Sequence, residues 1–143
     1  MGRIRVSHST DCEPMVGRDV LPPERHAELS DEELDSIHRD YFPRDGERLS
    51  LAESTFLPGT VVRPHAHNRD EIIYVTRGEL RAGSHVLGPG DALYVDSHTL
   101  YGFTVGPEGC TFVNFRVSRG QYIPKAELLE QRRTADGAGD APA

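Results

Sequence analysis

The chain has 143 residues, two cysteines and a formal net charge of −7. That length fits one domain with its own hydrophobic core, and the sequence has no apolar run near the roughly 18 residues that a transmembrane helix requires. The acidity is concentrated in residues 11–53, which hold 13 acidic residues against five arginines. No basic stripe is present to contact phosphates, so the composition argues against nucleic-acid binding.

The cysteines and the N-terminal residues lead to an expectation about the compartment. Cys12 and Cys110 lie far apart and match neither a metal-binding nor a redox spacing. Residues 1–13 carry charge but lack the apolar segment of an export signal. We therefore predict a cytoplasmic protein with two reduced thiols and no membrane association.

An acidic arm is predicted over residues 1–47. Residues 3–6 alternate charged and apolar side chains, which predicts a short edge strand. Residues 7–29 contain three prolines and a glycine and are expected to be irregular. Ser30 and Glu33 have the spacing of a capping box, which predicts a helix from Ser30 to about Tyr41. Its inner face would carry Leu34, Ile37, His38 and Tyr41.

From residue 48 the pattern changes to short β-type runs separated by glycine-rich turns. Eight strands are predicted, at 48–57, 60–66, 71–76, 79–82, 85–87, 92–95, 100–105 and 110–117. Turns are expected between them, including one at 77–78 and one at 106–109. This spacing predicts an all-β sandwich or jelly-roll barrel over residues 48–118. A C-terminal helix is assigned to 119–133, with Pro124 opening it, and 134–143 is expected to be a disordered tail of the same single domain.

The most informative stretch is 59–78. His65 and His67 are two residues apart, so on a strand both imidazoles face the same side. Residues 68–70 predict a short turn, after which Glu71 returns its carboxylate to that side. Two imidazoles and one carboxylate hold non-haem iron with open coordination positions, and they also suit zinc, manganese, nickel or cobalt. An alternative is a structural site that holds no metal.

These residues also resemble a known family. The spacing of the first cupin motif is matched in full by Gly59, His65, His67, Glu71 and Gly78. Residues 90–101 are similar to the second motif, but its usual proline, glycine and last histidine are replaced by Asp96, His98 and Tyr101. The resemblance covers about 48–117 and implies a cupin-type double-stranded β-helix. Tyr101 would stand where the family has its fourth metal ligand.

Strand alternation predicts the residues around this site. Arg63 shares the face of the two histidines, and a cation there could bind a substrate carboxylate, unless it lies at the barrel mouth. Tyr101 has three interpretations: a phenolate ligand, a general acid or base, or a packing residue. His98 is an alternative fourth ligand or pocket residue, although its position is typical of an exposed turn. The apolar walls of the substrate pocket would be Ile73, Val75 and Phe103.

Three functions are compatible with this site. The favoured one is a mononuclear Fe(II)-dependent dioxygenase acting on a small organic substrate. The second is a redox-neutral lyase or isomerase in which Tyr101 moves a proton, with parts similar to the cupin dimethylsulfoniopropionate lyases and isomerases. The third is a non-catalytic binding or sensor module. The resemblance also implies a homodimer formed by strand exchange, for which residues 3–6 would supply an edge strand.

Overall fold

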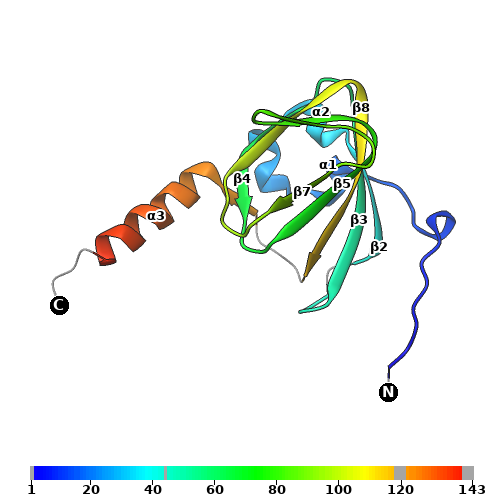
Figure 1. Cartoon of the computed structure of the whole chain (residues 1–143), viewed down its shortest axis with the longest axis horizontal. Helices are drawn as coiled ribbons and strands as arrows, with labels where there is room; N and C mark the ends of the chain where they lie inside the picture. Colours follow the sequence, from blue (N-terminus) through cyan, green and yellow to red (C-terminus); the bar gives the residue numbers. More distant parts are fainter. Residues whose placement is uncertain (1, 44, 118–121, 140–143) are drawn as a thin grey trace.

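The computed structural model describes residues 2–43, 45–117 and 122–139. Among these residues, antiparallel strands form one curved sheet that closes as a bowl, with short helical turns over its mouth (Figure 1). The strands are β1 Met15–Val16, β2 Ile37–Phe42, β3 Leu49–Phe56, β4 Val61–His67, β5 Glu71–Ala82, β6 His85–Leu87, β7 Ala92–Val95, β8 Tyr101–Val117 and β9 Tyr122–Pro124. The helices are η1 Ser9–Asp11, α1 Gly17–Val20, η2 Pro23–Glu28, α2 Asp31–Leu34 and α3 Lys125–Gly139. The predicted all-β jelly-roll class is confirmed.

The longest strand, β8, organises the sheet. Its second half pairs with β3 on one side and with β5 on the other, so that Phe115 lies opposite both Leu51 and Ile72. Its first half pairs with β4, with Phe103 opposite Val62. This strand therefore lies at the centre of the sheet, and the strands on its two sides curve around a common interior (Figure 1).

Two predicted turns, at 77–78 and 106–109, are instead irregularities within continuous strands. The register between β5 and β8 shifts on both sides of Gly78. Gly78 and Gly109 have φ of 75° and 84°, and a Cβ on Gly78 would overlap the carbonyl oxygen of Gly109. The sequence predicted turns at these glycines, but they instead allow two neighbouring strands to approach closely at a bulge.

The N-terminal prediction was wrong in two places. The capping box at Ser30 and Glu33 forms, but α2 ends at Leu34 and residues 37–42 are strand β2. Tertiary pairing explains this, because β2 aligns with β3 along its length, and such pairing overrides a local helix preference. Residues 3–6 form no strand, and Ile4 is 93% exposed.

The C-terminal prediction needs a similar correction. Residues 122–124 form strand β9, which pairs with β4, and α3 continues to Gly139 instead of ending at residue 133. Helix propagation costs little once the first turns exist, and Thr134 Oγ1 donates to the Glu130 carbonyl within it. Residue 118 of the predicted barrel, residues 119–121 of the assigned helix and residues 140–143 of the tail lie outside the described residues.

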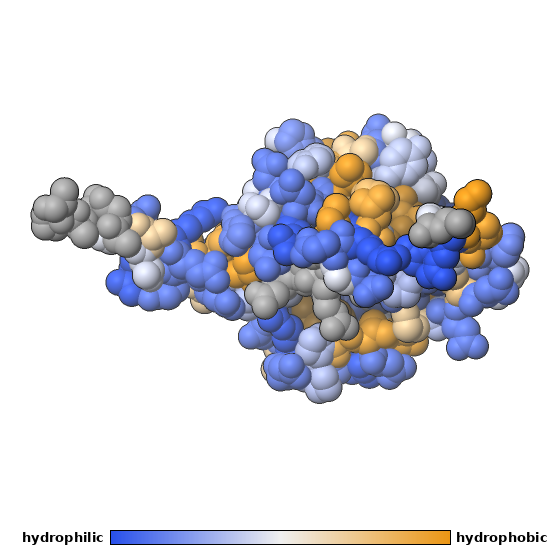
Figure 2. Space-filling view, turned by 90° about the horizontal axis from the view of Figure 1, so that it is seen from below, coloured by the Kyte–Doolittle hydropathy of each residue, from blue (hydrophilic) through white to orange (hydrophobic). Residues whose placement is uncertain are grey.

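Helix α3 contacts the barrel only near its start. Leu128 is buried with Ala66 and Ile123, whereas residues 129–137 are exposed. Figures 1 and 2 show the helix projecting from the body with a largely hydrophilic surface. No helix among the described residues is long and apolar enough to cross a membrane.

The main core lies inside the bowl. Strand β5 alternates regularly over residues 71–75, where Ile73 and Val75 are buried while Ile72 and Tyr74 reach the surface. On β8, Phe103 and Phe112 point into the same interior. Alternation on these strands therefore predicted the inward residues correctly.

Candidate functional site

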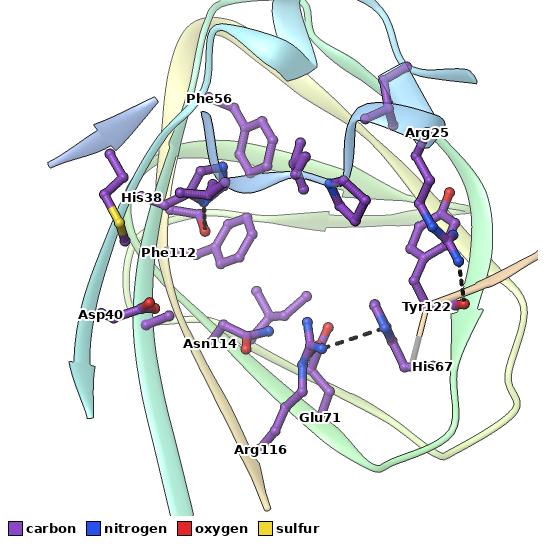
Figure 3. Close-up of a pocket in the computed structure, with 18 of the residues that line it drawn as sticks. Arg25, His38, Asp40, Phe56, His67, Glu71, Phe112, Asn114, Arg116 and Tyr122 are labelled. Atoms are coloured by element: carbon purple, nitrogen blue, oxygen red, sulfur yellow. Dashed lines mark hydrogen bonds and ion pairs between the residues drawn. The ribbon is translucent and has the colours of Figure 1, made fainter. Parts of the chain in front are cut away.

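A cavity of about 880 Å³ lies between the bowl and the N-terminal arm, which we define as residues 7–36. This volume is in the range of small-molecule sites. Its lining combines three groups of side chains (Figure 3). The arm contributes Val20, Leu21, Pro22 and Arg25; the aromatic wall consists of Phe56, Phe103 and Phe112; and the polar base consists of Glu71, Tyr101, Asn114 and Arg116.

The polar base is a buried network around one carboxylate. Glu71 is 2% exposed, and it forms an ion pair with Nε of Arg116, which is 7% exposed. The Tyr101 hydroxyl donates to the other oxygen, Glu71 Oε1, at 2.5 Å. Asn114 also bonds to this carboxylate. Strands β5 and β8 are direct neighbours, and Glu71 lies opposite Arg116 in their register, so the sheet itself brings the two charges together.

These contacts set the protonation states of the side chains in the polar base of the cavity. Burial would raise the pKa of Glu71, but the charge of Arg116 and the bonds from its neighbours outweigh burial and hold it below the usual value. Burial, and then the Glu71 charge, raise the pKa of Tyr101 well above 10. At neutral pH the base therefore contains a carboxylate, a guanidinium and a protonated phenol.

The two histidines of β4 lie beside this base. Their ring centroids are 5.0 Å apart, and the ring of His65 is 4.8 Å from that of Tyr101. His65 Nδ1 donates to the Arg63 carbonyl at 2.8 Å. Burial lowers the pKa of His65, so the ring is neutral and its lone pair is on Nε2. Arg116 Nη1 lies 3.5 Å from His67 Nδ1.

The structure brings most of the predicted site residues together. His67, Glu71, Tyr101, Ile73 and Phe103 line the cavity, and His65 is buried next to them. Three residues, Val75, His98 and Arg63, are placed elsewhere. Val75 is packed within the core and does not line the cavity. His98 is exposed in a turn with φ of 60°, where its amide donates to the His67 carbonyl.

Arg63 requires a correction. It is exposed and does not line the cavity, because the register between β4 and β8 shifts between Val62 and His65. Pro64 lies within this irregularity and cannot donate to the ladder. The alternation that would place Arg63 on the same face as His65 and His67 is therefore interrupted between Val62 and His65. The cavity obtains its cations from Arg25 and Arg116 instead.

Three residues in or beside the polar base were not predicted: Asn114, Arg116 and Tyr122. A signal for the first two exists, because Phe112, Asn114 and Arg116 alternate along β8 and are all buried. Tyr122 stacks on His65, with centroids 4.8 Å apart and planes at 13°. The pairing of β9 with β4 brings Tyr122 to that position, and no local sequence pattern predicts this contact.

The donor chemistry suits a divalent cation, but the arrangement does not fit one. Both oxygens of Glu71 are engaged, one by Arg116 and one by Tyr101. A cation bound to Glu71 would lie against the guanidinium, and like charges repel strongly in a buried site. No three His, Cys, Asp or Glu side chains among the described residues are placed to hold a metal ion.

Comparisons with known proteins agree with this fold. Residues 52–115 match the cupin domain family. The polyketide cyclase RemF from Streptomyces resistomycificus shares 23% identity over 87% of this chain and 85% of its own, with a TM-score of 0.65. An RmlC-like cupin from Ralstonia eutropha shares 14% identity over 87% and 75%, with a TM-score of 0.68.

A third similar structure is KdgF from a Halomonas species, with 20% identity over 82% of this chain and 96% of its own and a TM-score of 0.60. No curated protein sequence matches the chain. At these identities the structural likeness describes the fold alone.

Proposed function

Since residues 52–115 form a cupin domain, the chain belongs to the cupin superfamily, and we propose that it is a redox-neutral enzyme acting on a small organic substrate. The observation that carries the proposal is the hydrogen bond from Tyr101 to Glu71 at the base of the cavity. A phenol and a carboxylate held in contact can move one proton without a change in oxidation state.

The proposed step uses only residues of the polar base. The Tyr101 oxygen accepts a proton from a substrate carbon next to a carbonyl group, while its own proton passes to Glu71 Oε1. The electron pair of the broken C–H bond forms the enolate of the substrate. The proton then returns through Tyr101 to another substrate atom, which restores the enzyme. Arg116 positions Glu71 and offsets its charge before the transfer.

The cavity walls support a planar, apolar substrate body. The ring of Phe56 lies 5.6 Å from those of Phe103 and Phe112, and these two are 5.9 Å apart. Such a wall favours flat carbon skeletons. The similarity to a polyketide cyclase agrees with this class, because ring closure through an enolate and a carbonyl group is also redox-neutral.

Proton exchange tests this proposal without knowledge of the natural substrate. Wild-type protein in D₂O should accelerate deuterium incorporation into some members of a panel of aromatic 1,3-diketones, followed by NMR. Tyr101→Phe should reduce that rate by roughly 10²–10⁴-fold. Tyr94→Phe is the control, because Tyr94 is exposed on the outer face and donates to Asp70. An unchanged rate in Tyr101→Phe would refute the proposal, and ligand binding with no exchange would favour the binding module.

The Fe(II)-dependent dioxygenase is the second candidate. It is favoured by the donor types, because the imidazoles of His65 and His67, with ring centroids 5.0 Å apart, and the carboxylate of Glu71 are the kinds of ligand that hold such iron. It requires Glu71 to leave Arg116 and Tyr101. Metal analysis after purification without chelator separates the candidates: stoichiometric iron with O₂ uptake supports the dioxygenase. Arg116→Met should increase metal uptake, because it frees the carboxylate.

We also propose that the protein forms a homodimer. The segment 3–6, which was expected to exchange between subunits, is exposed and forms no strand in the single chain. Light scattering of the full chain and of a variant lacking residues 1–6 tests it: the expected result is a dimer that becomes a monomer on removal of the segment.

A further inference from the structure

The arm carries a second cavity arginine, Arg25, whose donors are only partly used. Its guanidinium carbon lies 4.3 Å from the centroid of the Tyr122 ring, and Nη2 donates to the Tyr122 carbonyl at 3.2 Å. Its Nη1 is buried and has no hydrogen-bond partner among the described residues. A buried charged donor without a partner costs free energy, so this nitrogen is suited to an acceptor that the chain itself does not supply.

Arg25 also differs from Arg116 in its ion pairing. It forms no ion pair in the part of the chain that the structure describes. Arg116, by contrast, is neutralised by Glu71. The carboxylates of Glu28 and Glu127 also line the cavity, but both residues are exposed, so water and salt screen their charge.

The position of Arg25 connects the arm to the polar base. Arg25 lies over one face of Tyr122, and Tyr122 stacks in turn on His65. Figure 3 shows Arg25 and Tyr122 at one side of the cavity, across from Phe56 and Phe112. A molecule that lies along the aromatic wall with its reacting end at Tyr101 would therefore have a cation within the same cavity.

We propose that Arg25 binds an anionic group of the ligand, so that the cavity selects planar apolar molecules with a carboxylate. The bound carboxylate accepts a charge-assisted hydrogen bond from Nη1, which otherwise lacks an acceptor. The arm then serves as the anion-binding wall of the cavity. That this ligand is the substrate rests on the proposed function, whereas the binding preference itself does not.

Calorimetric titration with 2-naphthoate and 2-naphthamide tests the proposal, because the two probes share one ring system and differ in charge. Wild-type protein should bind naphthoate at least tenfold more tightly than naphthamide. Arg25→Gln should bind both with the same affinity. Arg18→Gln is the matched control, since Arg18 is an exposed arm arginine that pairs with Asp31 and Asp35 outside the cavity, and it should keep the full preference.

Arg25→Lys provides a second variant, which keeps the charge but lacks the planar fork, and a reduced preference of about two- to threefold is expected. Retained binding of naphthamide shows that each variant has an intact cavity. Equal affinity for both probes in the wild type, binding of neither, or a preference that survives in Arg25→Gln would overturn the proposal. Because the probes do not react, these outcomes are independent of the exchange assay with Tyr101→Phe.

Discussion

The polar base and the arm each contribute one arginine to the cavity, and the two are satisfied in opposite ways. Arg116 is fixed by Glu71 between two paired strands and is nearly inaccessible to water. Arg25 belongs to a short 3-10 turn and keeps one donor without a partner among the described residues. This contrast indicates two different roles. Arg116, which is paired within the sheet, preorganises the polar base, whereas Arg25 on the arm keeps a donor that a ligand can use.

The largest loss of stability is expected for a substitution in the polar base. Arg116→Ala should lower the free energy of unfolding by about 3–5 kcal/mol, because it leaves the Glu71 carboxylate buried without its counter-ion. Urea denaturation measures this. Arg81→Ala is the control, since Arg81 and Glu79 form an exposed pair, and it should cost about 1 kcal/mol or less. Similar losses in both variants would show that the base is not the more tightly held region.

Tyr101→Phe should have the next largest effect, a loss of about 1.5–3 kcal/mol, because a buried carboxylate loses a donor. Tyr94→Phe removes a hydroxyl that donates to an exposed carboxylate, Asp70, and should cost clearly less stability, because water can replace that donor. The same denaturation experiment compares them. A larger loss in Tyr94→Phe would contradict the role given to burial.

Ser30→Ala addresses the arm. It removes the side chain that accepts from the Glu33 amide in the capping box of α2, and a loss of about 1 kcal/mol is expected. Amide hydrogen exchange should show the change mainly at residues 31–36. Ser84→Ala, in an exposed turn, should be neutral. If Ser30→Ala destabilised the chain as strongly as Arg116→Ala, the arm would be as integral to the fold as the base.

The smallest effect is expected for Arg18→Ala, at about 0.5 kcal/mol or less. Its ion pairs with Asp31 and Asp35 are exposed, and such pairs contribute little. A shift in the thermal midpoint of more than a few degrees would indicate that surface charges hold the arm in place. In that case the separate role of Arg25 would have to be re-examined together with them.

The sequence by itself determined the barrel and much of its base. The cupin spacing and the regular alternation of β5 placed Glu71 and Ile73 correctly, and alternation in β8 did the same for Tyr101 and Phe103. These inferences held because a side-chain period of two survives wherever a strand is regular. They failed where the strand is irregular, as at Arg63.

Only the tertiary structure decided which charges meet. The pairing of Glu71 with Arg116 joins residues of two strands, and the contact of Arg25 with Tyr122 joins the arm to β9. Tertiary pairing with β3 also makes residues 37–42 strand β2, where the sequence predicted a helix. Such contacts depend on the register between distant strands, which a local pattern does not encode. For that reason the donor set of a metal site was visible in the sequence, while the guanidinium that engages its carboxylate was not.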